Sequence, residues 1–144
     1  MMQLRQKRVL VDGLLFLFLV VSFICSQAAA NTGIAFLWPI HVLTGIIFGI
    51  LAIVHFKLNM KLFRGIKNQS QGKYIVDCLL VITWVCALLL GFPAMGYRFG
   101  ELGQLGSLAS FHGLLGQIGG ALAIIHMVQH GDLIKGYMKK KSIE

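Results

Sequence analysis

The sequence predicts an all-α membrane protein, a four-transmembrane-helix bundle, because three observations agree. Hydrophobic residues make up 57% of the 144 residues and charged residues only 12%, which is too little charge for a soluble domain or a disordered chain. Four apolar stretches each have about the 20 residues that a helix needs to cross a lipid bilayer. Twelve of the 13 lysines and arginines lie at the ends of these stretches, on one side of the predicted membrane.

The four predicted membrane helices cover residues 9–29, 39–58, 74–96 and 108–129. The first follows a basic start, and the second begins at Trp38 and Pro39, an interfacial aromatic residue and a residue suited to the first helical turn. The third follows Lys73, and the fourth follows a glycine-rich segment. All four apolar runs are continuous rather than alternating, which argues against a transmembrane β-barrel.

The first stretch also has the features of a cleaved signal peptide: a basic start, an apolar middle and three alanines at 28–30. However, VDGLL at 11–15 resembles VDCLL at 76–80, in the third stretch. This correspondence favours a retained first helix.

The cations predict the topology. Three precede the first stretch, five lie between the second and third, and four follow the last, which leaves Arg98 alone on the other side. The positive-inside rule then places both termini in the cytoplasm. Topology explains the net charge of +8, so no nucleic-acid partner is expected.

The second half of the chain repeats the first. HVLTGIIFGILAIVHFKLN at 41–59 aligns with HGLLGQIGGALAIIHMVQH at 112–130 at one constant shift. The aligned pairs are His41 with His112, Gly45 with Gly116, Gly49 with Gly120, His55 with His126 and Asn59 with His130. We therefore expect one membrane domain, residues 1–144, built from two helix-loop-helix repeats.

The paired histidines indicate haem ligation. Fourteen residues of helix span about 21 Å and almost complete four turns, so His41 and His55 share a face at two depths. His112 and His126 repeat this spacing on a helix that is expected to run parallel. Each depth then offers two imidazoles, which is the ligand set of a bis-histidine haem.

Other interpretations of these residues stay open. The histidines also fit a metal or proton transporter, and the chain also fits a haem-free membrane anchor of a redox complex. A zinc site is disfavoured, because no third ligand is expected at either depth. The glycines Gly45, Gly49, Gly116 and Gly120, with Gly119, fit close approach to a porphyrin and close helix packing equally well.

Four polar residues lie toward the predicted cytoplasmic ends of the helices, the ends that also carry His55 and His126. Asn59 and His130, one turn beyond them, are candidates for hydrogen bonds to haem propionates or to the ligands, or are ordinary polar residues at helix ends. Asp12 and Asp77 begin their helices at matching depths, where they are expected to be solvated in the headgroup layer, and a proton or quinol role is the alternative.

The pattern H-x3-G-x9-H followed by L-N at 41–59, with its second copy, resembles the flavinylation-associated cytochrome family. The resemblance covers residues 9–130, and the histidine spacing is also similar to the haem helices of respiratory cytochrome b. It implies a small multi-pass protein of the bacterial inner membrane with two b haems, held by His41, His55, His112 and His126. The second copy departs by having His130 in place of Asn59.

This resemblance implies electron transfer from quinol or a cytoplasmic donor to an extracytoplasmic redox protein that bears flavin or haem. An oxidoreductase subunit with quinol-oxidising activity is compatible with it, but no catalytic residue is predicted. The 92–108 segment, rich in glycine, is expected to be an outer loop that covers the outer haem and docks the acceptor.

Overall fold

The computed structural model describes residues 4–64, 71–99 and 106–141, without the side chains of 5, 61–64, 97–99 and 132–141. The described chain consists of four helices: α1 (Leu4–Thr32), α2 (Leu37–Arg64), α3 (Gln71–Phe99) and α4 (Gly106–Lys141). They divide into two compact units. We call residues 1–66, with α1 and α2, the first hairpin and residues 67–144, with α3 and α4, the second hairpin.

All four helices are long and apolar enough to cross a membrane, as the sequence predicted. The qualifying segments are Gln6–Thr32, Leu37–Met60, Gln71–Gly96 and Gly106–Gly131. Each contains 24 to 27 residues, and a membrane span needs about 20. The chain is therefore an all-α, multi-pass membrane protein by length and composition. The prediction that both hairpins form a single domain stays a prediction.

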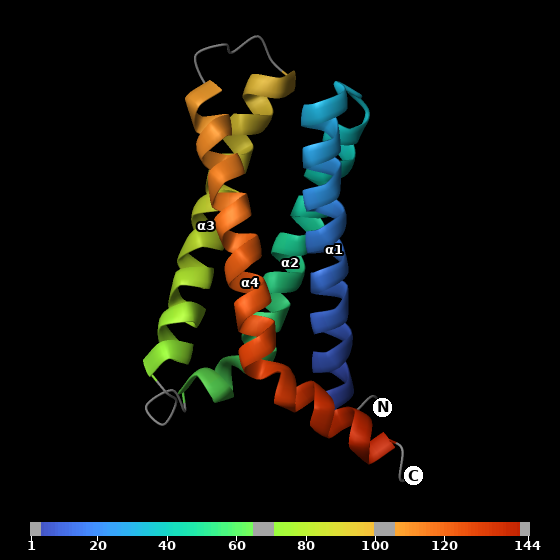
Figure 1. Ribbon diagram of the computed structural model, residues 1–144, viewed down its shortest axis with the longest axis vertical. Helices are drawn as coiled ribbons and strands as arrows, with labels where there is room; N and C mark the ends of the chain where they lie inside the picture. The colour runs from blue at the N-terminus through green and yellow to red at the C-terminus, as the bar shows by residue number, and fades with distance from the viewer. Residues whose placement is uncertain (1–3, 65–70, 100–105, 142–144) are drawn as a thin grey trace. The chain divides into compact units, whose positions relative to one another are not determined.

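The two helices of each hairpin pack side by side, α1 against α2 and α3 against α4 (Figure 1). The residues buried between them are mostly small or polar: Ser22, Ala29, Thr44 and Phe48 in the first hairpin, and Asp77, Thr83, Ala87 and Ala94 in the second. Large apolar side chains such as Leu89 and Val128 are exposed. Small residues at the contact and large apolar residues outside are typical of helices packed within lipid.

A tight turn joins α1 to α2. Gly33 has a φ of +71°, which a residue without Cβ adopts at little cost. Its N–H donates to the Ala29 carbonyl at 3.1 Å, so Gly33 ends α1 as a left-handed cap. The N–H groups of Leu37 and Trp38 bond back to residues 34 and 35 at 3.2 Å and start α2.

The end of α3 differs from the loop that was expected to begin at residue 92. Helix α3 contains Pro93 and continues through Phe99, although proline withholds the N–H that the carbonyl four residues earlier would receive. The loop prediction is therefore wrong for residues 92–99 and for 106–108, which belong to α4. Residues 100–105 lie outside the part of the chain that the structure describes.

Candidate functional site

Each hairpin places one histidine near its connecting segment, and we call His41 and His112 the turn-end histidines. Nδ1 of His41 lies 2.9 Å from the carbonyl oxygen of Ser22 on α1. Nδ1 of His112 lies 2.8 Å from the carbonyl oxygen of Ala87 on α3. A carbonyl oxygen can only accept a hydrogen bond, so Nδ1 donates in both residues.

Ser22 adds a second contact at the first of these positions. Its Oγ lies 2.9 Å from Nδ1 of His41 and donates to the His41 carbonyl at 3.3 Å. Ser22 is buried, and the ring of Trp38 meets the imidazole edge-on with centroids 6.2 Å apart. Ser22 on α1 and Trp38 on α2 together fix the orientation of the His41 ring.

The other two histidines, His55 and His126, lie toward the opposite end of each hairpin, and we call them the open-end histidines. Nδ1 of His55 lies 2.6 Å from Oδ1 of Asp12 on α1. Nδ1 of His126 lies 2.7 Å from Oδ1 of Asp77 on α3. A carboxylate also accepts, and hydrogen bonds to a charged acceptor are typically short. All four predicted ligands therefore have Nδ1 held by a group on the neighbouring helix.

These contacts select one tautomer of the neutral imidazoles. When Nδ1 carries the proton and donates it, Nε2 carries the lone pair that can bind a metal. Metal-bound histidines almost always donate their other ring N–H to a carboxylate or a backbone carbonyl, and this bond fixes the orientation of the ring. The four histidines have the hydrogen-bond pattern of Nε2 metal ligands.

Asn59 and His130 both contact the open-end histidine of their own helix. The Asn59 side chain donates to the His55 carbonyl at 3.0 Å, and its nitrogen lies 3.4 Å from Nδ1 of His55. The His130 ring lies beside that of His126, with centroids 4.6 Å apart. The two residues are therefore more than polar residues at a helix end, while a contact with haem propionates stays a prediction.

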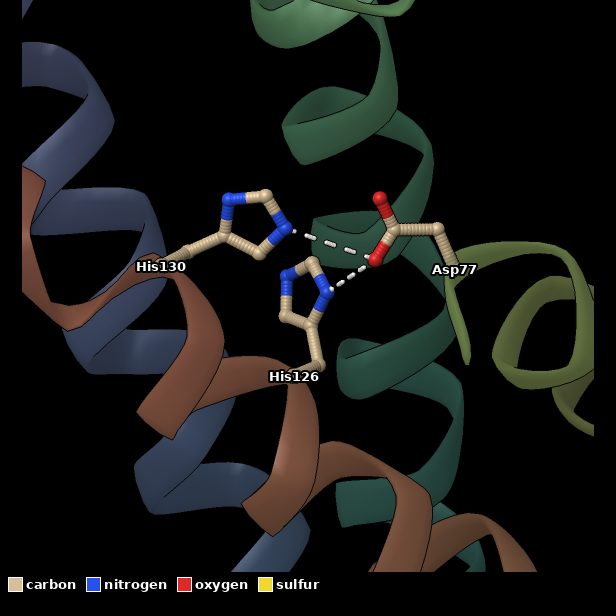
Figure 2. A group of neighbouring side chains, drawn as sticks. All are labelled: Asp77, His126 and His130. Atoms are coloured by element: carbon tan, nitrogen blue, oxygen red, sulfur yellow. Dashed lines mark hydrogen bonds and ion pairs between the residues drawn. The ribbon is translucent and has the colours of Figure 1, made fainter. Parts of the chain in front are cut away.

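Asp77, His126 and His130 form a compact group. Figure 2 shows both imidazoles pointing toward the Asp77 carboxylate, and Nε2 of His130 lies 3.5 Å from its Oδ1. One ligand atom from each residue lies within 4.8 Å of the others, as a metal ion would require. The expectation that no third ligand joins either depth is therefore wrong in the second hairpin, because Asp77 was assigned to the headgroup layer.

The glycines separate into two kinds by what an added Cβ would meet. At Gly116 and Gly120 it would meet nothing within 4 Å, and at Gly45 only Ser22 Oγ at 3.8 Å. At Gly119 it would lie 3.2 and 3.3 Å from the ring of Trp84 on α3. Gly119 therefore serves packing within the hairpin, whereas Gly45, Gly116 and Gly120 keep their candidacy as haem-facing positions, as does Gly49.

The difference between Gly119 and Gly120 leads to a testable prediction. Gly119→Leu should destabilise the second hairpin by about 1–3 kcal/mol, because it overpacks the contact with Trp84. Gly120→Leu should leave the thermal stability of the haem-free protein close to that of the native chain and should reduce haem content after haem-replete expression. Melting of the haem-free proteins, followed by circular dichroism in detergent, checks the first, and the haem-to-protein ratio of the loaded proteins checks the second. Equal melting temperatures would contradict the assignment of Gly119.

Several residues at this site were missed or misassigned by the sequence interpretation. Asp12 and Asp77 were noted at matching depths but assigned to lipid headgroups, and the Ser22 and Ala87 carbonyls have no signal in a side-chain pattern. Gly91 was also missed, and a Cβ added there would lie 3.4 Å from Cε1 of His112.

Comparisons of the chain with family models, curated proteins and solved structures give no match.

Proposed function

We propose that this protein is a transmembrane electron-transfer cytochrome that binds two b haems through His41, His55, His112 and His126. The observation that supports the proposal is that these four residues share a location and a hydrogen-bond pattern. All four sit in membrane-spanning segments, and all four have Nδ1 bonded to an acceptor on the neighbouring helix. This donor set fits haem iron, because each of these histidines would offer it the lone pair of a neutral Nε2.

Matching contacts support the proposal that the two hairpins are repeats. In the first hairpin α1 contributes Arg8, Asp12 and Ser22, and in the second α3 contributes Lys73, Asp77 and Ala87, at one constant offset in the sequence. Their partners are Leu58, His55 and His41 on α2, and Gln129, His126 and His112 on α4, again at one constant offset. A repeat of each of these contacts in the same order is unexpected for unrelated hairpins.

The proposed ligand pairs join the two repeats. His41 with His112 would hold one haem, and His55 with His126 would hold the other. A four-helix bundle with both hairpins in the same orientation would bring each pair to one depth. The haems would supply one-electron chemistry, while the protein supplies orientation, ligand tautomer and an apolar surround.

Charge and resemblance support the proposed direction and partners. The positive-inside rule would place the open-end histidines near the cytoplasm and the turn-end histidines near the outer surface. Quinol or a cytoplasmic donor would reduce the protein, and a flavin- or haem-bearing domain outside a bacterial inner membrane would accept the electrons. These assignments follow the resemblance to flavinylation-associated cytochromes.

We expect two haems per chain in protein purified from haem-replete cells. The haem-to-protein ratio, from the pyridine haemochrome spectrum and amino-acid analysis, checks the number. A reduced-minus-oxidised spectrum and electron paramagnetic resonance check bis-histidine ligation. A ratio near one or zero would contradict the proposal. Protein that carries no haem but about one zinc per chain would favour the alternative that the Asp77–His126–His130 group binds a divalent cation.

A further inference from the structure

The two ends of each hairpin differ in the charge of the groups that hold the histidines. Both turn-end histidines donate to neutral backbone carbonyls, at 2.9 and 2.8 Å. Both open-end histidines donate to carboxylates, at 2.6 and 2.7 Å. The same difference occurs independently in each hairpin, so it follows the position of the histidine along the hairpin.

A carboxylate bonded to a histidine changes the reduction potential of the metal that the histidine would bind. A strong acceptor on Nδ1–H increases the electron donation of Nε2 and raises the basicity of the ligand. A negative charge near the metal also stabilises the more positive, oxidised state, and this effect is large where water is scarce. Both effects lower the reduction potential. A neutral carbonyl increases the electron donation of Nε2 more weakly, and it carries no net charge to stabilise the oxidised metal.

Each carboxylate has a cation one helical turn away on its own helix, and that cation is bonded elsewhere. Arg8 lies one helical turn from Asp12 and donates to the Leu58 carbonyl at 3.1 and 2.8 Å. Lys73 lies one turn from Asp77 and donates to the Gln129 carbonyl at 3.0 Å. Each cation is thus bonded to the backbone of the opposite helix, whereas each carboxylate touches the imidazole directly.

We propose that Asp12 and Asp77 are positioning residues that give the haem at the open-end histidines a lower reduction potential than the haem at the turn-end histidines. The inference rests on the proposed function. Such an order makes electron movement from the open end toward the turn end energetically downhill. It matches the outward direction that the charge distribution supports.

The test is a potentiometric titration of the haem-loaded protein in detergent, monitored optically. Native protein should show two midpoints. Asp12→Asn and Asp77→Asn keep an acceptor oxygen but remove the charge, so each should raise the lower midpoint and leave the upper one in place. Asp77→Glu restores the charge and should bring the lower midpoint back toward the native value. Ser22→Ala, which keeps the carbonyl that accepts from His41, should leave the lower midpoint unchanged.

A second variant makes the test independent of these substitutions. His112→Ala removes a turn-end ligand, so the haem that remains should have the lower of the two native midpoints. A remaining haem with the upper midpoint would overturn the inference, as would unchanged lower midpoints in both Asn variants. In either case two bis-histidine haems would still uphold the proposed function. Protein without haem would overturn both.

Discussion

His41→Ala and His112→Ala are each expected to abolish the same haem and to leave the other one spectroscopically intact. The two residues are equivalent in the two hairpins, since each donates Nδ1–H to a backbone carbonyl of the neighbouring helix. Loss of one axial imidazole from a bis-histidine site removes half of its protein ligands. Haem content should therefore fall from two per chain toward one in both variants, with the same midpoint and the same spectral bands remaining.

His55→Ala and His126→Ala should remove the other haem. Leu43→Ala and Leu114→Ala are matched controls, because each replaces an exposed side chain two residues from a turn-end histidine and should retain both haems. Optical spectra at low temperature, electron paramagnetic resonance and redox titration identify which haem is lost. If His41→Ala instead shared its spectrum with His126→Ala, the hairpins would pair in opposite orientations and the proposed ligand pairs would be wrong.

The helices could be predicted from the sequence because their signal is local. A continuous apolar run of about 20 residues is visible in composition alone, and the four predicted stretches fall within α1 to α4. The ends were less predictable. α3 passes through Pro93 to Phe99, although proline is unfavourable inside a helix.

The four histidines could also be proposed from spacing, but their hydrogen-bond partners could not. A partner depends on the register and rotation of two helices against each other, which neither helix encodes alone. A short turn does constrain the register, because Asp12 lies almost as far before the end of α1 as His55 lies after the start of α2. Asp77 and His126 are likewise nearly equidistant from the facing ends of α3 and α4. In each hairpin the aspartate and the histidine are separated from the connecting segment by similar numbers of residues. This similarity was the signal that would have assigned both aspartates to the site instead of the headgroup layer.

Removal of the aspartates should weaken haem binding, and more strongly at Asp77 than at Asp12. Asp77 is buried, with 8% of the residue exposed, and it faces two imidazoles, His126 at 2.7 Å and His130 at 3.5 Å. In Asp77→Ala the half-buried His126 loses the acceptor of its Nδ1–H, and His130 loses the neighbouring carboxylate. An unsatisfied buried polar group costs about 1–3 kcal/mol, and loss of such a partner typically lowers metal affinity by about 10–100-fold. We expect a loss of haem affinity in that range.

Asp12→Ala makes the matched comparison, because it removes the same bond from His55 at a less buried position. The Asp12 side chain is 38% exposed, against 10% for Asp77, and it faces one imidazole rather than two, so its removal disturbs fewer groups. Its effect on haem retention should be several-fold smaller, and it should fall on the same haem if His55 and His126 share one. Competition with apomyoglobin measures the loss rate of each haem, and Cys86→Ala, an exposed residue of α3, controls for substitution in that helix. Equal losses in Asp12→Ala and Asp77→Ala would show that burial does not set the size of the effect, and losses from different haems would contradict the pairing of His55 with His126.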